Sequence, residues 1–335
     1  MSVDLTTRYL GLTLKNPLVV SACPLTGDLD SLRQLAAAGA AAVVLPSLFE
    51  EQIEHDELAI HQLYEFQTES FAESLDYFPQ LDDYNTGPDS YLKQIRAAKQ
   101  AVDIPVIGSL NGESSGGWTR YAQLFEKAGA DALELNIYFV PTDVELSGQQ
   151  VEDRYVELVA SVRRTVAIPL AIKVGPFFSS LPHMARRLAS AGADGLVLFN
   201  RYLEPDIDLE TLDVVPRLEL SHREELRVPL RWIAILRDRV ATSLAATTGV
   251  HEADDALKVL LAGADVAMMA SALLKHGPGH LTAMLDQLRG WLVEHQYASI
   301  EQLKGSVSQK NCADPAAYER SNYMKALISY SGDFI

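Results

Sequence analysis

A short phrase that recurs four times constrains the fold of this chain more than any other feature. Ala-Gly-Ala stands at 38–40, 128–130, 191–193 and 262–264, and Asp follows the last three copies. Each copy comes after a stretch with helical periodicity and before a short apolar run. The pattern predicts a helix, a glycine that ends it in a left-handed conformation, and then a buried strand. Strands that are apolar on both faces are typical of parallel sheets.

The spacing of these copies predicts further strands between them. Successive glycines of the phrase are 90, 63 and 71 residues apart, whereas one strand and its helix take roughly 35–45 residues. Further apolar runs lie at PLVVSAC, which begins at Pro17, and at 104–110, 168–174 and 241–249. Eight strands alternating with helices favour a (β/α)8 TIM barrel, and an open doubly wound sheet is the alternative.

Two long connections interrupt this regular alternation. Residues 47–90 follow the second strand and residues 201–228 follow the sixth, so we expect both at the C-terminal face, where barrel enzymes have their active sites. The first contains twelve carboxylates and no Lys or Arg. It is interpreted as a solvated lid helix, or as a surface that docks a protein partner or attracts cations. We expect a single domain over 1–335, with a C-terminal extension over about 297–335.

Composition excludes several classes of function. The formal net charge of −17 and the pI near 4.8 disfavour nucleic acids and anionic membranes as partners. Cys23 and Cys312 are the two cysteines, and the histidines show no metal-ligand spacing, so we expect neither disulfides nor a metal. The sequence has no nicotinamide-binding, P-loop or nucleophile-elbow motif, and no apolar stretch of membrane-spanning length. We expect a cytoplasmic protein.

Chemistry in a barrel is expected where the strands end. Thr248-Gly249 after the seventh strand and Ala270-Ser271 after the eighth suit a phosphate, although a plain tight turn would use similar residues. Lys173 ends an apolar strand and needs an anionic partner, which is either a ligand such as reduced flavin or the carboxylate of Glu134. Two asparagines at strand ends need partners as well, either a ligand or loop backbone; they are Asn136 and Asn200.

Several longer segments together resemble a known family. They include KNPLVVSACPLT, IKVGPFF, ATTGVHEADDALKVLLAGADV and the tail SVSQKNCADPAAYERSNYMKAL. The chain resembles the dihydroorotate dehydrogenase family, and within it the bacterial dihydroorotate dehydrogenase-like branch. The resemblance implies an FMN-dependent oxidoreductase that acts on CH–CH groups of a small molecule. It also implies a link to pyrimidine metabolism and a homodimer.

The resemblance assigns roles to individual residues. Lys173 would stabilise the N1/O2 side of the flavin and is the candidate catalytic residue. Asn136 and Asn200 would reach the substrate. The residues that would bind the FMN cofactor are Ala22, Ser47, Asn111, Asn136, Lys173, Thr248, Gly249, Ala270 and Ser271.

The chain departs from the family pattern on the substrate side. Phe139 stands where the family has the Cys or Ser that takes a proton from dihydroorotate, and a phenyl ring cannot accept a proton. Pro141 replaces a substrate-binding Asn, and Pro46 replaces a Lys that contacts flavin and substrate. We therefore expect an FMN oxidoreductase with another substrate. The alternatives are a true dihydroorotate dehydrogenase of pyrimidine biosynthesis with a relocated base, and a non-catalytic flavin-binding partner of an oxidoreductase complex.

Overall fold

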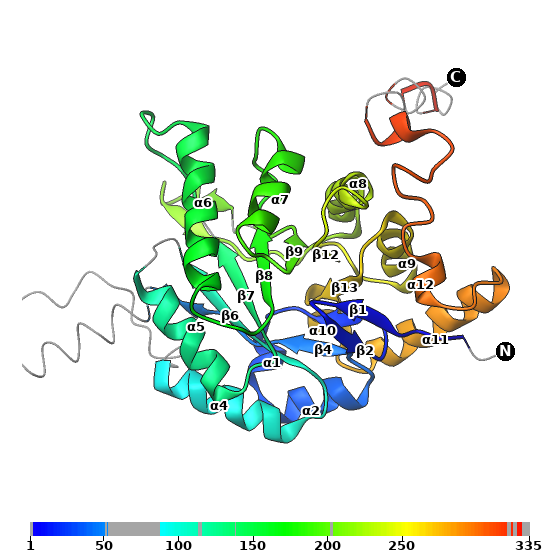
Figure 1. The fold of residues 1–335 in the computed structure, drawn as a ribbon, viewed down its shortest axis with the longest axis horizontal. Coiled ribbons are helices and arrows are strands. Elements are labelled where there is room, and N and C mark those ends of the chain that lie inside the picture. Colours follow the sequence, from blue (N-terminus) through cyan, green and yellow to red (C-terminus); the bar gives the residue numbers. More distant parts are fainter. Residues whose placement is uncertain are drawn as a thin grey trace, which may run out of the picture.

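The structure, a computed structural model, describes residues 3–50, 52, 88–112, 116–137, 139–201, 204–319, 323 and 327–329. Within these residues, eight parallel strands close into a barrel, and helices surround it (Figure 1). The strands are β3 (Leu18–Val20), β4 (Ala42–Val44), β6 (Val106–Gly112), β7 (Ala132–Ile137), β8 (Leu170–Val174), β9 (Gly195–Leu198), β12 (Ser243–Ala246) and β13 (Val266–Met269). Pairing of β4 with β6 closes the ring, so the predicted TIM barrel is confirmed and the open sheet is excluded.

The helices follow the strands in the predicted alternation. They are α1 (Pro24–Gly27), α2 (Leu29–Ala37), α4 (Pro88–Ala101), α5 (Gly116–Ala128), α6 (Gly148–Arg163), α7 (Leu181–Ser190), α8 (Arg227–Leu236), α9 (Ala253–Ala262), α10 (Ser271–His276), α11 (His280–Glu294) and α12 (Ile300–Leu303). Two 3₁₀ helices are η1 (Arg223–Leu226) and η2 (Pro315–Tyr318). None of the helices described here is both long and apolar enough to cross a membrane.

The repeated phrase forms the N-terminal end of the barrel. All four of its glycines have φ between 98° and 126°, which confirms the predicted left-handed helix ends. The aspartates that follow three of them each accept a hydrogen bond from the backbone of the preceding strand. These bonds are Val106 N to Asp131 (2.7 Å), Leu170 N to Asp194 (2.8 Å) and Leu244 N to Asp265 (2.8 Å). The phrase thus ties each strand to its neighbour.

An N-terminal hairpin, β1 (Thr7–Tyr9) and β2 (Leu12–Leu14), covers the same end of the barrel. Its Tyr9, Leu10 and Leu14 are buried and belong to one cluster with the inward-facing side chains of the barrel strands. Nothing in the periodicity of the sequence indicated this hairpin. The hairpin closes the N-terminal end of the barrel, so a ligand would have to enter at the opposite, C-terminal end.

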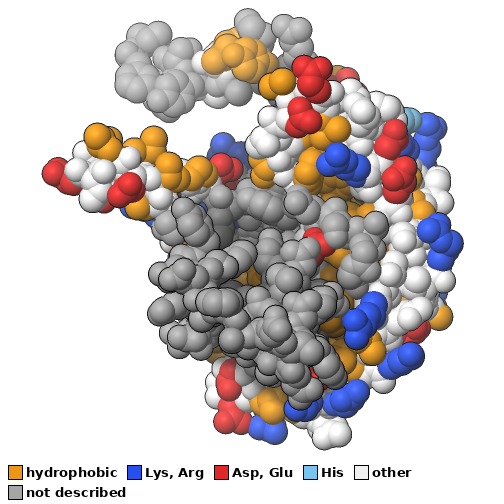
Figure 2. All heavy atoms as spheres, turned by 90° about the vertical axis from the view of Figure 1, so that its left-hand side faces the viewer, with side chains coloured by type: hydrophobic (Ala, Val, Ile, Leu, Met, Phe, Trp, Pro, Cys, Tyr) orange, Lys and Arg blue, Asp and Glu red, His pale blue; other side chains and the backbone are white. Residues whose placement is uncertain are grey.

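The two long connections differ in how much of them is described. Most of the acidic segment 47–90 lies outside the described residues; its first part contains β5 (Leu48–Phe49), which pairs with β6. The connection after the sixth strand forms a second hairpin, β10 (Pro205–Ile207) and β11 (Val214–Pro216). Its exposed apolar side chains include Leu209 and Leu212. In Figure 2, hydrophobic and acidic side chains lie together on a lobe that stands out at the height of this hairpin.

The described part of the C-terminal extension packs on the outside of the barrel. Ile300 N donates to Asp4 O at 3.0 Å, Val307 N to Leu261 O at 2.9 Å, and Gln309 N to Ala234 O at 2.9 Å. Beyond α12 the chain runs along the side of α8 and α9 (Figure 1). These backbone contacts place the extension away from the C-terminal ends of the strands.

Candidate active site

One cavity of about 330 Å³ lies over the C-terminal ends of the strands, and every residue predicted to bind cofactor or substrate lines it. These residues are Ala22, Ser47, Asn111, Asn136, Lys173, Asn200, Thr248, Gly249, Ala270 and Ser271. They come from all eight strand ends, as expected for a barrel active site. We call this space the inner cavity.

Three polar side chains lie side by side on the floor of the inner cavity. Asn111 on β6, Asn136 on β7 and Lys173 on β8 are register partners across the two strand pairs. The Lys173 side chain is 12% exposed, and its Nζ lies 3.7 Å from Oε1 of Glu134. Both partners considered from the sequence are therefore available to Lys173: the lysine lines the cavity and also faces Glu134.

Glu134 is a fully buried carboxyl below this row. Burial raises its pKa, while the nearby Lys173 ammonium and its hydrogen bond act in the opposite direction. The side chain points into the barrel, where the hydroxyl of Tyr9 is also buried. A carboxyl in such a place reduces the positive field that Lys173 exerts on a ligand in the cavity.

Asn136 is a buried amide of the inner cavity whose oxygen is unpaired within the described part of the chain. Its side chain is 7% exposed, and among the described residues no hydrogen-bond partner reaches its Oδ1. Buried amide oxygens in native proteins are nearly always satisfied, because an unpaired one loses its bond to water without replacement. The sequence left loop backbone as an alternative partner for this oxygen. Among the described residues, no loop backbone group donates to it.

The turn after the seventh strand has an unusual backbone. Thr248 and Gly249 both have positive φ, 74° and 79°. A Cβ on Gly249 would lie 2.5 Å from the backbone nitrogen of Leu226, so only glycine fits against η1. Thr248 Oγ1 donates to the carbonyl of Phe199 at 3.1 Å. This turn therefore has a packing reason for its glycine, in addition to the close ligand approach expected from the sequence.

Sequence reasoning missed the residues that the sixth connection contributes. Leu218 to Ser221 also line the inner cavity, and Ser221 is buried. Its backbone N–H donates to Ser271 Oγ at 3.1 Å, and its hydroxyl lies 3.2 Å from Nε2 of His251. The contact between Ser221 and Ser271 joins positions 50 residues apart and depends on an irregular loop, so no local sequence pattern could have indicated it. Cys23, next to Ala22, lines the cavity too, and burial raises the pKa of its thiol.

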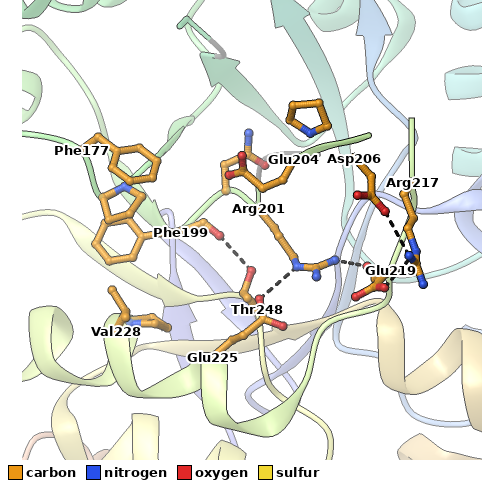
Figure 3. Close-up of a pocket in the computed structure, with 14 residues that line it drawn as sticks. Phe177, Phe199, Arg201, Glu204, Asp206, Arg217, Glu219, Glu225, Val228 and Thr248 are labelled. Atoms are coloured by element: carbon orange, nitrogen blue, oxygen red, sulfur yellow. Dashed lines mark hydrogen bonds and ion pairs between the residues drawn. The ribbon is translucent and has the colours of Figure 1, made fainter. Parts of the chain in front are cut away.

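A second cavity of about 510 Å³ adjoins the first, and we call it the outer cavity. The two share lining residues, namely Phe199, Asn200, Arg201, Glu219 and Thr248. Figure 3 shows aromatic and apolar side chains on one side of it and the charged side chains on the other. The outer cavity therefore adjoins the inner cavity, which Lys173 and Asn136 line.

The three residues that depart from the family pattern are placed differently. Pro46 lines the inner cavity, whereas Phe139 and Pro141 line a third hollow, which shares Glu204 and Phe177 with the outer cavity. The guanidinium carbon of Arg154 lies 5.1 Å from the centre of the Phe139 ring. The position of the family's base is thus occupied by a packed aromatic ring.

Comparison with known proteins agrees with this architecture. The profile of the family described as dihydroorotate dehydrogenase matches residues 76–292, more than half of the chain. The catalytic subunit of dihydroorotate dehydrogenase B (NAD(+)) from Thermoplasma volcanium is 27% identical over 308 residues, which cover 90% of this chain and 98% of the relative. The corresponding subunit from Methanocaldococcus jannaschii is 23% identical over 310 residues, 90% of this chain and 97% of the relative.

A relative described as the A (fumarate) type is similar over a shorter part of the chain. The putative dihydroorotate dehydrogenase A (fumarate) from Aeropyrum pernix is 27% identical over 219 residues, 64% of this chain and 71% of the relative. Barrel, strand-end residues and comparisons converge: the chain belongs to the dihydroorotate dehydrogenase family and is a dihydroorotate dehydrogenase-like oxidoreductase.

Proposed function

We propose that the chain is an FMN-dependent oxidoreductase that acts on a CH–CH bond of a small molecule other than dihydroorotate. The observation that carries the proposal is the unsatisfied Oδ1 of Asn136, which lines the same cavity as Lys173 and the Thr248-Gly249 turn. A cavity with an ammonium, a free amide acceptor and small residues suits a planar ligand with mixed polar edges.

The residues present fit FMN. The flavin ring offers hydrogen-bond donors and acceptors along its edge, so it would supply the donor that Asn136 Oδ1 lacks. Lys173 would face the side that becomes electron-rich on reduction. The small side chains of Ala22 and Ala270 take up little of the cavity beside the strand ends. The hydroxyl of Ser271, already held by the N–H of Ser221, would be directed to the phosphate.

When bound, FMN would supply the site that accepts or donates a hydride. The chain itself would then orient the ring and keep a positive charge beside it. Lys173 would provide that charge from a largely buried position, where it acts more strongly than at the surface. Leu218 to Ser221, which form part of the lining, would help to exclude water once a ligand is bound.

Dihydroorotate is disfavoured as the substrate because its oxidation releases a proton as well as a hydride. Phe139 cannot accept that proton, and it lines the third hollow, not the inner cavity. Cys23 places a thiol in the inner cavity, but burial raises its pKa and keeps it protonated at neutral pH. A relocated base would have to be found elsewhere, so true dihydroorotate dehydrogenase activity remains the second candidate.

An absorption spectrum of the purified protein, followed by FMN titration of the apoprotein, tests the cofactor. We expect a flavin spectrum and stoichiometric uptake. Lys173→Met should weaken uptake, whereas Lys258→Met, which removes an exposed lysine on α9, should not. A protein that stays colourless with added FMN would refute the cofactor proposal. Rapid bleaching of the loaded protein by dihydroorotate would refute the substrate proposal and favour the second candidate.

The homodimer and a partner protein at the acidic segment 47–90 stay predictions from the resemblance and from charge. Sedimentation of the flavin-loaded protein, alone and mixed with a cell extract, would test them.

A further inference from the structure

The outer cavity is placed where a substrate would meet the cofactor. It shares five lining residues with the inner cavity, including Asn200, which the resemblance assigns to the substrate. A molecule held there would lie against whatever occupies the inner cavity. Its volume of about 510 Å³ suits a small organic ligand.

One wall of the outer cavity is apolar and partly open to water. Phe177 is 74% exposed and Val228 is 47% exposed, and Phe199 lies beside them (Figure 3). Binding of a flat apolar group would remove such aromatic and apolar surface from water, which lowers the free energy.

The other wall contains two arginines that are already neutralised. Arg201 Nε lies 3.0 Å from Glu225 Oε2, and Arg201 also donates to the carbonyl of Glu219. Arg217 pairs with Asp206 at 3.0 Å and with Glu219 at 3.1 Å. An anionic ligand would have to compete with these carboxylates for the charge of either guanidinium.

A further carboxylate of the lining is not paired. Glu204 has no ion-pair partner among the described residues, and it lines both the outer cavity and the hollow that contains Phe139. Counted together, two arginines face four carboxylates, Glu204, Asp206, Glu219 and Glu225, so the lining has a formal charge of 2 − 4 = −2. The field in the cavity therefore attracts cations and repels carboxylates.

We propose that the outer cavity is the substrate site and that it takes an uncharged or cationic molecule with a flat apolar part, while rejecting carboxylates. The inference rests on the proposed function, because it concerns the substrate of that same site. Phe139 bears on catalysis, because the base is missing there. The charge of the outer cavity bears on binding: it predicts which ligands bind, whether or not a base is present. Glu204 is the residue that sets the preference for charge.

Three probes of nearly equal shape test this preference: benzamidine, benzamide and benzoate, which are cationic, neutral and anionic. Their binding is measured by calorimetry with both the apoprotein and the FMN-loaded protein. We expect benzamidine and benzamide to bind about threefold to fivefold more tightly than benzoate, the range expected for a partly exposed charge. Equal binding of all three, tighter binding of benzoate, or no binding of any at millimolar concentration would overturn the proposal.

Variants assign the effect to the outer cavity. Glu204→Lys should reverse the order of benzamidine and benzoate, whereas Glu210→Gln, at an exposed carboxylate outside the lining, should leave it unchanged. Phe177→Ala should weaken all three probes alike by about tenfold, and Leu209→Ala, an equally exposed apolar residue on the hairpin, should not. If Glu204→Lys keeps the wild-type order, the proposal fails.

The outcomes separate this inference from the proposed function. A colourless protein that still discriminates the probes would refute the cofactor and keep the charge preference. A yellow protein that binds benzoate as well as benzamidine would keep the cofactor and refute the charge preference. Perturbation of the flavin absorption by bound benzamidine would show that the two cavities are adjacent when both are filled.

Discussion

Two buried asparagines at opposite ends of the barrel have opposite environments. Asn16, 4% exposed, lies at the N-terminal end, where its Nδ2 donates to Gly39 O at 2.8 Å and its Oδ1 accepts from Leu18 N at 2.9 Å. Asn136, 7% exposed, lies at the C-terminal end, and its Oδ1 has no partner among the described residues. The same side chain thus serves stability at one end and is available for binding at the other.

The difference extends beyond the two asparagines. At the N-terminal end, the aspartates of the repeated phrase accept backbone hydrogen bonds and pair with cations as well. At the C-terminal end, polar groups line cavities, and the amide oxygen of Asn136 has no partner among the described residues. Removing a group from the first end should reduce the free energy of unfolding, whereas removing one from the second should reduce ligand affinity.

The largest expected effect is at the N-terminal end. Asp265→Ala removes the acceptor of Leu244 N and the 2.8 Å partner of Lys304, whose side chain is 4% exposed. Because a buried ammonium would keep only its second carboxylate partner, Glu301 at 2.7 Å, and the buried N–H of Leu244 would lose its acceptor, we expect the free energy of unfolding to fall by about 3 kcal/mol. Urea denaturation measures it, with Asp286→Ala as the control, since that carboxylate is exposed in its pair with Arg289. A loss equal to the control's would contradict the division of roles.

The pair of asparagines gives the most direct test. Asn16→Ala should cost about 1–3 kcal/mol of unfolding free energy, because it leaves Gly39 O and Leu18 N unpaired. Asn136→Ala should change stability by roughly 0.5 kcal/mol or less, since its oxygen has no bond to lose, and should weaken FMN binding about fivefold. Thermal unfolding of both apoproteins and FMN titration measure the two effects. Similar destabilisation by both changes would show that the two ends do not differ.

Lys173→Met should act on the cofactor more than on the fold. We expect FMN to bind about tenfold more weakly, because a charge-assisted contact is lost. The midpoint potential of the bound flavin should also fall, since the electron-rich reduced ring loses a nearby cation. Spectroelectrochemistry of the loaded protein measures the potential. An unchanged potential would mean that the ammonium interacts only with Glu134.

Glu134→Gln should have the smallest effect and a defined dependence on pH. Burial raises the pKa of Glu134 in the folded state above its ordinary value of 4.5. The stability that this carboxyl contributes is therefore fully present below that value and is lost as pH rises through the folded-state pKa. Glutamine does not titrate, so the variant should gain on the wild type as pH rises, by about 1 kcal/mol or less near neutrality. Urea denaturation at acid and neutral pH tests this; a difference that does not vary with pH would contradict it.

Much of the barrel could be predicted because its signals are local. The glycine that ends a helix and the apolar run that follows it are adjacent in the chain, so the repeated phrase predicted four strands and its spacing indicated the others. The polar residues at strand ends follow from the same register, which explains why all ten predicted site residues line one cavity. That they bind FMN or substrate stays a prediction.

The remaining features depend on contacts between distant segments. The β1–β2 hairpin closes the barrel through packing of Tyr9 and Leu10 with residues far along the chain. The contact of Ser221 with Ser271 depends on the path of an irregular connection. The charge balance of the outer cavity likewise requires Arg201, Glu219 and Glu225 to be brought together by that connection. The sequence shows such residues but not which of them meet.

The connection between β9 and α8 contributes to both cavities: it forms part of the lining of the inner cavity and the acidic side of the outer cavity. Glu219 pairs with Arg217 while its neighbours Leu220 and Ser221 cover the space above Ser271. If the chain binds the proposed flavin, exchanging this loop for that of a relative would alter two properties in a single step: which molecules enter, and how long the flavin is retained. Re-engineering selectivity here should begin with single side chains such as Glu204 and leave the loop backbone intact.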